Sequence, residues 1–395
     1  MYITVVGQGY VGIPLAIEAS QAEFKVFGLD SNEEKINLLM NGKSVIADIS
    51  DETIQMCINS KAYIPTTDQS VISFSEVVLI CVPTPLTPNG QPDLSILINA
   101  ITEVGKMLKP GTLIITESTI DPGTSRNTLL PILLKESGLG VNDFDLAYSP
   151  ERIDPSNQSW NIKNTPKLVA GLTHIAAKRA ENFYKKFITE VYICPSFEIA
   201  ETAKLLENSF RFINISFVNE LAIFCHKIGI EVNDVIKAAS TKPYGFMPFY
   251  PSIGVGGHCI PVDPIYLAEA AKSVGADFKF IDLANKVNQE MPKYFVGRAE
   301  EKLTDLKGKK ILVIGVSYKP NVSDVRESPV KSLITELEIK GAQVSWHDEL
   351  VKEWNSQVSV ELSSNYDLAI LATPHDYLDL TKIGNTPLIN TQRSV

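Results

Sequence analysis

The chain has 395 residues, of which 44% are hydrophobic and 21% charged, a balance typical of a globular protein of two or three domains. Its 46 acidic residues outnumber the 36 basic ones, and the resulting net charge of −10 disfavours binding to nucleic acid. No apolar run reaches the roughly 18 residues of a membrane span, and the N-terminus has no signal-peptide pattern. We therefore expect a cytoplasmic protein with neither nucleic acid nor membrane among its partners.

Five scattered cysteines bear on redox compartment and metal binding. An odd number without a CxxC pair disfavours a disulfide or zinc framework and is typical of a reducing cytoplasm. His258 directly precedes Cys259, and it has no second ligand at metal-binding spacing. We expect no metal.

The first thirty residues predict a dinucleotide-binding unit. An apolar strand, Tyr2–Val6, leads into the glycines Gly7, Gly9 and Gly12 and then into a helical stretch. In this motif the glycines permit a tight turn, the approach of a pyrophosphate, and close helix–strand packing. A second strand ends at Asp30, which would accept hydrogen bonds from a ribose diol and repel a 2′-phosphate. The prediction is NAD rather than NADP; a glycine turn with Asp30 as a helix cap is the alternative.

Three further strands are predicted at 77–83, 112–118 and 145–151, each ending in a polar or proline-rich loop. Open α/β sheets bind ligands at these carboxyl ends. The proline-rich stretch 82–90 is interpreted as a rigid wall beside the cofactor, with an ordinary surface loop as the alternative.

Residues 198–227 predict a long helix that is apolar on nearly every side, as in a protein core or a subunit interface. One stripe differs, because Glu201, Lys204, Asn208 and Arg211 have the spacing of a single helical face. We interpret this stripe as one wall of a site for an anionic substrate. A solvated Glu–Lys ladder is the alternative.

The segment 241–267 carries the strongest catalytic signal. Glycines at 254, 256 and 257 bring the backbone close to a neighbour, and Cys259 follows them. Pro264 suits the first position of a helix, with Asp263 as its N-cap. The positive end of that helix would favour a thiolate, so Cys259 is the predicted nucleophile. The other cysteines, in apolar surroundings, are predicted to be inert core residues: Cys57, Cys81, Cys194 and Cys225.

A helix at 278–306, interrupted at Pro292, precedes a second strand-and-turn at 309–320 in which only Gly315 remains of the dinucleotide motif. Strands at 342–348 and 367–374 complete a smaller parallel sheet. The predicted fold is α/β, with two Rossmann-like parallel-sheet domains joined by a central helical region. The predicted boundaries are 1–195, 196–300 and 301–395.

Seven motifs in this order resemble those of the UDP-glucose/GDP-mannose dehydrogenase family along essentially the whole chain. They are GQGYVG (7–12), CVPTP (81–85), ESTIDPGT (117–124), YSPERIDP (148–155), KLLENSFR (204–211), GGHCIPVDP (256–264) and GVSYKPNVSDVRESP (315–329). The chain is most similar to the UDP-N-acetylhexosamine branch. Val262 and Pro155 stand where the UDP-glucose branch has a lysine and a second glutamate.

The resemblance implies an NAD-dependent, four-electron oxidation of the C6 hydroxyl of a UDP-sugar to a carboxylate, serving polysaccharide or glycan biosynthesis. UDP-N-acetylglucosamine is the expected substrate, and UDP-N-acetylmannosamine and UDP-glucose are alternatives. Of the three domains, the first would bind NAD and the third would bind the UDP-sugar. The central one would form the homodimer interface and carry catalytic residues. A two-electron hydroxyacid dehydrogenase and a non-catalytic nucleotide-sugar sensor are the rival classes.

The resemblance also assigns roles to residues. Cys259 would form a thiohemiacetal and then a thioester, with Lys204 as general base or alkoxide-stabilising cation and Asn208 as hydrogen-bond donor. Asp263 and Glu151 would handle the hydrolytic water. The expected NAD-binding residues are Gly7, Gly9, Tyr10, Val11, Gly12, Asp30, Lys35, Thr84, Thr119 and Arg326. The expected UDP-sugar residues are Arg152, Ile153, Lys204, Asn208, Arg211, Tyr250, Gly256, Tyr318, Lys319 and Arg393.

Overall fold

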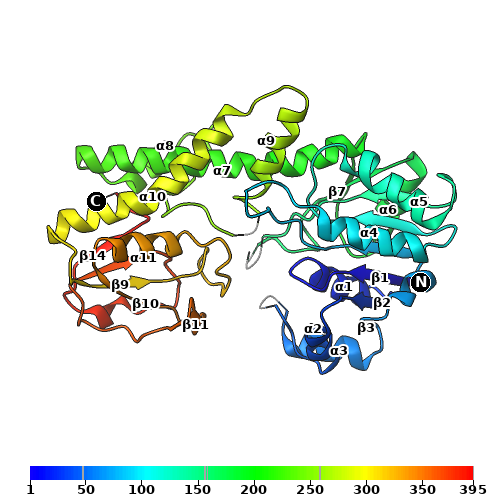
Figure 1. Ribbon diagram of the computed structural model, residues 1–395, viewed down its shortest axis with the longest axis horizontal. Helices are drawn as coiled ribbons and strands as arrows, with labels where there is room; N and C mark the ends of the chain where they lie inside the picture. The colour runs from blue at the N-terminus through cyan, green and yellow to red at the C-terminus, as the bar shows by residue number, and fades with distance from the viewer. Residues whose placement is uncertain (47–48, 155–156, 158, 258, 395) are drawn as a thin grey trace. The chain divides into compact units, whose positions relative to one another are not determined.

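A computed structural model of the protein describes residues 1–46, 49–154, 157, 159–257 and 259–394 (Figure 1). The chain forms two compact units, Met1–Glu207 with Ile265–Val274, and Asn208–Pro264 with Gly275–Val395. Each unit contains a parallel sheet with helices, and a long helix enters both, which confirms the predicted α/β class. The three-part division with boundaries after 195 and 300 stays a prediction.

The sheet of the first unit has eight strands within the described residues, in the order β3-β2-β1-β4-β5-β6-β7-β8. Neighbouring strands are parallel except β6 and β7, which are antiparallel. The strands are β1 (Tyr2–Val6), β2 (Lys25–Leu29), β3 (Tyr63–Thr66), β4 (Val77–Ile80), β5 (Leu113–Thr116), β6 (Asp145–Tyr148), β7 (Lys167–Gly171) and β8 (Val191–Ile193). The predicted strands at 77–83, 112–118 and 145–151 were too long, because the chain turns away once pairing stops at Ile80, Thr116 and Tyr148.

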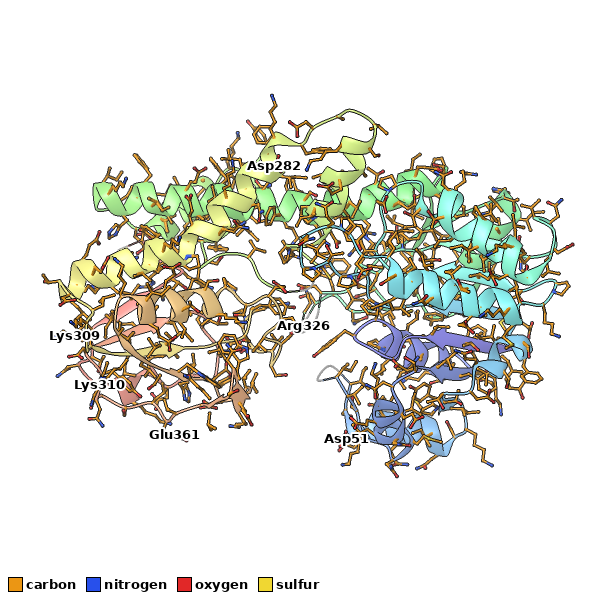
Figure 2. All side chains as sticks on the ribbon, in the orientation of Figure 1. Asp51, Asp282, Lys309, Lys310, Arg326 and Glu361 are labelled. Carbon is orange, nitrogen blue, oxygen red and sulfur yellow. The ribbon has the colours of Figure 1, made fainter. Side chains whose placement is uncertain are left out.

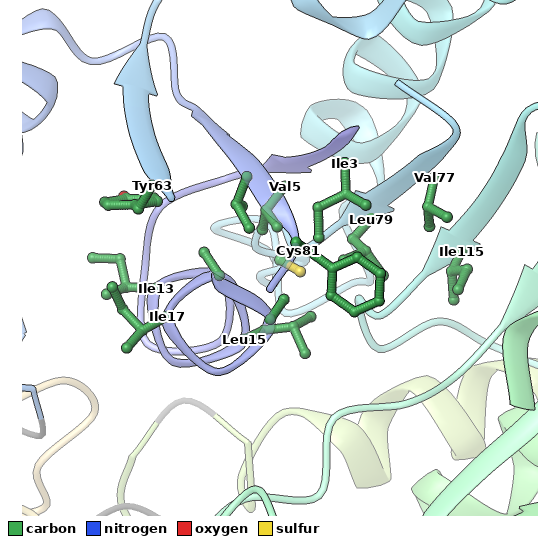
Figure 3. Close-up of a cluster of buried hydrophobic side chains, with 14 of the residues drawn as sticks. Ile3, Val5, Ile13, Leu15, Ile17, Tyr63, Val77, Leu79, Cys81 and Ile115 are labelled. Atoms are coloured by element: carbon green, nitrogen blue, oxygen red, sulfur yellow. The ribbon is translucent and has the colours of Figure 1, made fainter. Parts of the chain in front are cut away.

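Helices cover both faces of this sheet. One apolar cluster joins the sheet to α1, α2, α3 and α6, and Figure 3 shows its centre, where Ile13 and Leu15 of α1 lie near Val5 and Leu79. A second cluster joins the opposite face to α4, α5 and the start of α7. The helices are α1 (Gly12–Gln21), α2 (Glu33–Met40), α3 (Asp51–Asn59), α4 (Ser95–Met107), α5 (Leu130–Ser137), α6 (His174–Tyr184) and α7 (Phe197–Ile228). Central strand β4 is apolar throughout because it is buried on both faces, and β1 beside it is buried from Ile3 to Val5.

The glycine motif between β1 and α1 is fixed by close packing. Gly7 has φ = +92°, and a Cβ there would lie 2.8 Å from the carbonyl oxygen of Cys81. A Cβ on Gly12, the first residue of α1, would lie 1.8 Å from the carbonyl oxygen of Gly7. A Cβ on Gly9 would have no neighbour within 4 Å. Two of the three glycines are therefore required by the fold, whereas Gly9 keeps an open approach to the backbone.

The second unit is built on a smaller sheet, whose four strands within the described residues run parallel in the order β10-β9-β13-β14. One apolar cluster packs α10 and α11 on this sheet, and another covers the opposite face with residues from 360–388. A third joins α7 to α8. The elements are α8 (Val232–Ala239), α9 (Asp263–Ser273, mostly in the first unit), α10 (Lys279–Leu303), β9 (Lys310–Ile314), α11 (Val330–Ile339), β10 (Gln343–His347), the hairpin β11–β12 (Glu353–Trp354, Gln357–Val358), β13 (Leu368–Leu371) and β14 (Leu388–Asn390).

The predicted interruption at Pro292 is wrong, because α10 continues through this residue. A proline in a helix leaves the carbonyl four residues earlier, here that of Asn288, without its usual amide donor. Gly254 lies against this carbonyl, and a Cβ at Gly254 would lie 2.9 Å from its oxygen. The Asn288 side chain is buried and bonds Ser216 and Asn219 of α7. Packing against α7 thus maintains α10 across the proline.

We predict that Gly12→Ala destabilises the first unit by about 1–3 kcal/mol, the cost of over-packing a tight site. Gly9→Ala is the matched control and should change the free energy of unfolding by less than about 0.5 kcal/mol. Urea denaturation followed by circular dichroism measures both. Equal losses in the free energy of unfolding would contradict the difference in packing between Gly12 and Gly9.

Candidate active site

Asp30 ties the glycine motif to the end of β2. Its Oδ2 accepts a hydrogen bond from the Gln8 amide at 2.8 Å and pairs with Lys35 Nζ at 2.6 Å. Its Oδ1 accepts a bond from the Asn32 amide. The carboxylate is fixed beside the motif, and the Lys35 cation offsets part of its charge. Tyr10 and Val11 are half-buried in the same turn.

The arrangement of this turn fits an NAD dinucleotide. Gly9 leaves its backbone open, α1 begins directly after the motif, and Asp30 stands where a ribose diol would be recognised. The motif and Asp30 would therefore hold the cofactor's pyrophosphate and adenosine ribose, while the nicotinamide supplies a hydride acceptor.

The proline-rich stretch after β4 is anchored at several points. Thr84 is buried, and its hydroxyl donates to the Thr119 carbonyl at 2.7 Å. Tyr266 of α9 donates to the carbonyls of Thr84 and Pro85. These bonds favour the rigid-wall interpretation over a loose surface loop. Nothing in the sequence singled out Tyr266.

Glu151 and Lys204 lie near each other in the first unit. Lys204 Nζ is 3.9 Å from Glu151 Oε2, and both side chains are largely buried. The Ile153 amide donates to Glu151. Arg152 pairs with Glu207 at 2.7 Å and donates to the Pro166 carbonyl. The predicted residues 151–153 and 204 are thus brought together, and the Arg152 guanidinium already has protein partners.

A buried ion pair supports this loop. Glu117 and Lys167 pair with almost no exposure, and Lys167 also donates to the carbonyl of Pro150, next to Glu151. Tyr184 donates its hydroxyl to Glu117, and burial raises the pKa of that hydroxyl. The sequence motif contains Glu117 but gives no sign of its role, because its partner Lys167 is 50 positions away in the chain.

The predicted stripe on α7 divides into a buried part and an exposed end. Glu201 is fully buried and accepts hydrogen bonds from the amides of Gly123 and Ser125, at 2.6 and 3.0 Å. Burial raises the pKa of Glu201 despite these bonds. Lys204 and Asn208 are also buried, so the alternative of a solvated ladder is wrong. Arg211 is exposed, because none of the described residues covers its side chain, and it does not continue the buried wall.

Asn208 bonds the helix that follows Cys259. Its Nδ2 donates to Asp263 Oδ2 at 2.6 Å, and both residues are buried. The predicted N-cap position is wrong by one residue, because α9 begins at Asp263 itself. The turn at Cys259–Val262 precedes α9, and the Cys259 carbonyl accepts hydrogen bonds from the amides of Val262 and Asp263. Two predicted catalytic residues are therefore bonded directly, and Cys259 lies one turn away.

The five cysteines, all in the described part of the chain, fall into two classes. Cys259 is partly exposed, whereas the other four are buried. Burial raises the pKa of Cys81, Cys194 and Cys225. The environments match the predicted contrast between one accessible thiol and four core thiols.

The glycines before Cys259 approach another segment of this chain, residues 315–329. A Cβ on Gly256 would lie 2.8 Å from the Glu327 carbonyl oxygen, and one on Gly257, where φ is +88°, would lie 2.8 Å from the Tyr318 ring. The Gly257 amide donates to the Arg326 carbonyl. Arg326, labelled in Figure 2, pairs through its guanidinium with Asp324. The predicted residues Gly256, Tyr318 and Arg326 are thus neighbours within the second unit.

Other predicted residues have less definite surroundings. Tyr250 and the Arg393 side chain are exposed, and the Arg393 carbonyl accepts a hydrogen bond from Arg298. Lys319 is half-buried. His258 and Pro155 lie outside the described residues. The described residues contain no cluster of three or more metal-ligating side chains, and none of their helices is long and apolar enough to cross a membrane.

Comparison with known proteins identifies the family. Three models of the UDP-glucose/GDP-mannose dehydrogenase family match in order: the NAD binding domain at 1–188, the central domain at 198–290 and the UDP binding domain at 312–391. This chain belongs to that family. As a member it is an NAD-dependent enzyme acting on a nucleotide sugar.

Similar proteins extend over nearly the whole chain. The UDP-N-acetyl-D-glucosamine 6-dehydrogenase of Pseudomonas aeruginosa is 34% identical over 386 residues, covering 94% of this chain and 90% of that protein. The UDP-N-acetyl-D-mannosamine dehydrogenase of Campylobacter jejuni is 32% identical, covering 96% and 94%. A UDP-D-ManNAc dehydrogenase structure from Pyrococcus horikoshii has a TM-score of 0.92 at 31% identity, covering 100% of this chain and 96% of the other.

We predict that iodoacetamide modifies the native dehydrogenase first at Cys259, because the other four thiols are buried. Intact mass followed by peptide mapping should show one adduct, and Cys259→Ser should remain unmodified on the same time scale. Equal labelling of Cys57 or Cys194 in the folded protein would contradict the contrast in exposure.

Proposed function

We propose that the enzyme oxidises the C6 hydroxyl of a UDP-N-acetylhexosamine to the carboxylate, with UDP-N-acetylglucosamine as the preferred substrate. The observation that carries the proposal is that Asn208 of α7 bonds Asp263, the residue at which the turn from the partly exposed Cys259 ends. The relatives named for N-acetylated UDP-hexoses support the substrate class. Their similar identities, 34% and 32%, leave UDP-N-acetylmannosamine as the principal alternative.

The proposed chemistry begins at the alcohol. Lys204 accepts the C6 hydroxyl proton or stabilises the developing alkoxide, and Asn208 donates a hydrogen bond to the same oxygen. NAD would supply the hydride acceptor for each of the two oxidations, with one NAD molecule consumed in each. The buried position of Lys204 beside Glu151 supports this role, since few waters compete for the ammonium group.

The second half of the reaction uses the thiol. The Cys259 thiolate adds to the C6 aldehyde, and the new C–S bond gives a thiohemiacetal once the oxygen takes a proton. Loss of a hydride and that proton leaves a thioester. Water then attacks the thioester carbon, the C–S bond breaks, and Cys259 leaves as the thiolate. Glu151 and Asp263 would accept the protons of this water. The sum is one sugar alcohol oxidised by four electrons with one water consumed.

A panel of UDP-sugars tests the proposal. Each sugar is mixed with the enzyme and excess NAD, and the NADH formed per sugar is counted by absorbance. We expect two NADH per sugar and the highest kcat/KM for UDP-N-acetylglucosamine. One NADH per sugar would favour a two-electron dehydrogenase, and none would favour a sensor. Faster turnover of UDP-glucose than of every N-acetylated sugar would contradict the substrate class.

Cys259→Ser serves as the mechanistic control in this assay. A serine hydroxyl is far less acidic than a thiol, so we expect kcat to fall by several orders of magnitude while the affinities for UDP and NAD change little. The quenched wild-type enzyme should carry a sugar adduct on Cys259. A variant with near-normal kcat and two NADH per sugar would exclude covalent catalysis by this residue.

We also propose that the enzyme is a homodimer in which α7 contributes to the interface. Leu206, Phe210, Phe217 and Phe224 of α7 are 46–64% exposed, which supports burial of this face by a second subunit. Light scattering at micromolar concentration should give twice the mass of the chain. Replacement of Phe217 and Phe224 by glutamate should shift the mass toward that of one chain, and a monomeric wild type would refute the proposal.

A further inference from the structure

The two sheets begin with the same local geometry. In the first unit β1 lies between β2 and β4, and in the second β9 lies between β10 and β13, with all pairs parallel. A glycine with positive φ ends each first strand, Gly7 at +92° and Gly315 at +80°. Each glycine amide donates at 2.8 Å to the last residue of the neighbouring strand. The two turns thus share one strand–turn geometry.

The acid at the end of the neighbouring strand is also repeated. The amide after each glycine donates to a carboxylate, that of Asp30 at 2.8 Å and that of Asp348 at 2.9 Å. Their surroundings differ. The Asp30 side chain is partly exposed beside Lys35, whereas that of Asp348 has no exposure and faces the equally buried His375. In the second unit, the imidazole of His375 therefore lies beside Asp348. In the first unit, the corresponding position beside Asp30 could hold a ribose.

Asp348 is fully bonded. Its Oδ1 accepts the amides of Leu350 and Val351, and its Oδ2 lies 3.2 Å from Nε2 of His375. Burial alone would raise the pKa of Asp348, but the hydrogen bonds from His375 and the Val316 amide hold it below its ordinary value. The carboxylate therefore stays ionised inside the unit and provides a fixed acceptor for His375.

The hydrogen bonds also settle the tautomer of His375. The backbone amide of Asn321 donates to Nδ1 at 2.9 Å, so Nδ1 carries no proton. The proton is on Nε2, which faces Asp348. His375 is a neutral imidazole that bridges a buried carboxylate on one side and a loop amide on the other, with the Tyr377 ring stacked on it at 4.9 Å.

Asn321 fastens the loop to His375 and Asp376 through three hydrogen bonds. Besides its amide bond to His375, its Nδ2 donates to Asp376 at 2.7 Å, and its Oδ1 accepts the Asp376 amide at 3.0 Å. Its φ of +63° is in the left-handed region, which asparagine tolerates better than most residues. One further bond, from the Thr373 hydroxyl to the Ser317 carbonyl, joins the same two segments.

The loop held in this way is 315–329, which carries Tyr318, Lys319 and Arg326. It lies against Gly256 and Gly257, which are three and two residues before Cys259. A shift of the loop would therefore move Tyr318 away from the backbone of the cysteine segment. The UDP binding domain match includes both the loop and His375.

We propose that His375 is a positioning residue for the UDP-sugar. By accepting the Asn321 amide while anchored on Asp348, it fixes residues 317–322 in the form that presents Tyr318 and Lys319 to the nucleotide sugar. This inference rests on the proposed function in that the second unit binds a UDP-sugar and that Tyr318 and Lys319 contact it. It requires no particular sugar and no oxidation.

His375 makes three hydrogen bonds: Nδ1 accepts the Asn321 amide, and Nε2 faces Asp348 at 3.2 Å and the Ser317 hydroxyl at 3.5 Å. Three substitutions separate the bonds of its two ring nitrogens. His375→Asn retains an acceptor near the Nδ1 position, His375→Gln retains a donor near the Nε2 position, and His375→Ala removes both. Calorimetry with UDP alone measures the affinity of the site for UDP in the absence of turnover. We expect His375→Ala to weaken UDP binding and raise the KM for the sugar by about tenfold, while kcat at saturation and the Kd for NAD change less than about threefold. His375→Asn should restore most of the UDP affinity, and His375→Gln should not.

His347→Ala is the matched control. His347 is another buried histidine of the second unit, and its Nδ1 bonds the carbonyl of Val360 rather than the loop. This variant should lower the melting temperature about as much as His375→Ala and leave UDP affinity unchanged.

Several outcomes would overturn the positioning role: unchanged UDP affinity in His375→Ala, an equal loss in His347→Ala, or rescue by Gln but not Asn. If the alanine variants fail to fold, the Asn and Gln comparison alone decides. A wild-type enzyme that binds UDP but oxidises no UDP-sugar would refute the proposed function and leave this test intact.

Discussion

The hydrogen bond between Asn208 and Asp263 joins α7 to the first residue of α9, and the cysteine turn is continuous with that junction. Both side chains are buried, where water does not readily replace a lost hydrogen bond, so breaking this bond would cost about 1–3 kcal/mol. The same two residues are assigned to the reaction by the proposal. The Asn208–Asp263 hydrogen bond therefore stabilises the fold and also fixes the end of the turn that begins at Cys259.

Buried carboxylates hold the loops that follow the strands. Glu201 accepts two backbone amides, Glu117 pairs with Lys167 beneath the segment that leads to Glu151, and Asp348 anchors the loop at 315–329 through His375. An ionised group taken out of water is tolerated only when such partners are complete. Each carboxylate therefore enforces one arrangement of its loop, because any other arrangement would leave its charge or the backbone amides unpaired.

The two units illustrate how one strand-turn geometry supports different binding. Both place an acid after the second strand and a backbone amide against it. In the first unit the acid remains accessible beside Gly9, whose backbone is open. In the second, His375 covers the acid and an ordered loop replaces the short glycine turn, with α11 starting only at Val330. Whether such a turn can hold a dinucleotide thus depends on the side chains and loops packed around a strand–turn geometry that both units share.

Local chemistry in the sequence was enough for the glycine turn between β1 and α1 and for the contrast between Cys259 and the four buried cysteines. The Gly7, Gly9 and Gly12 spacing, the apolar strands and the cysteine ahead of a helix all act over a few residues, so their consequences are visible without tertiary contacts. The antiparallel β7, the continuity of α10 through Pro292 and the exposed position of Arg211 were not predictable in this way. The partnerships of Glu117 with Lys167 and of Asp348 with His375 join residues far apart in the chain. A buried charge is costly unless it is paired. Its partner can come from any part of the chain, so only the tertiary structure decides which distant groups are buried together.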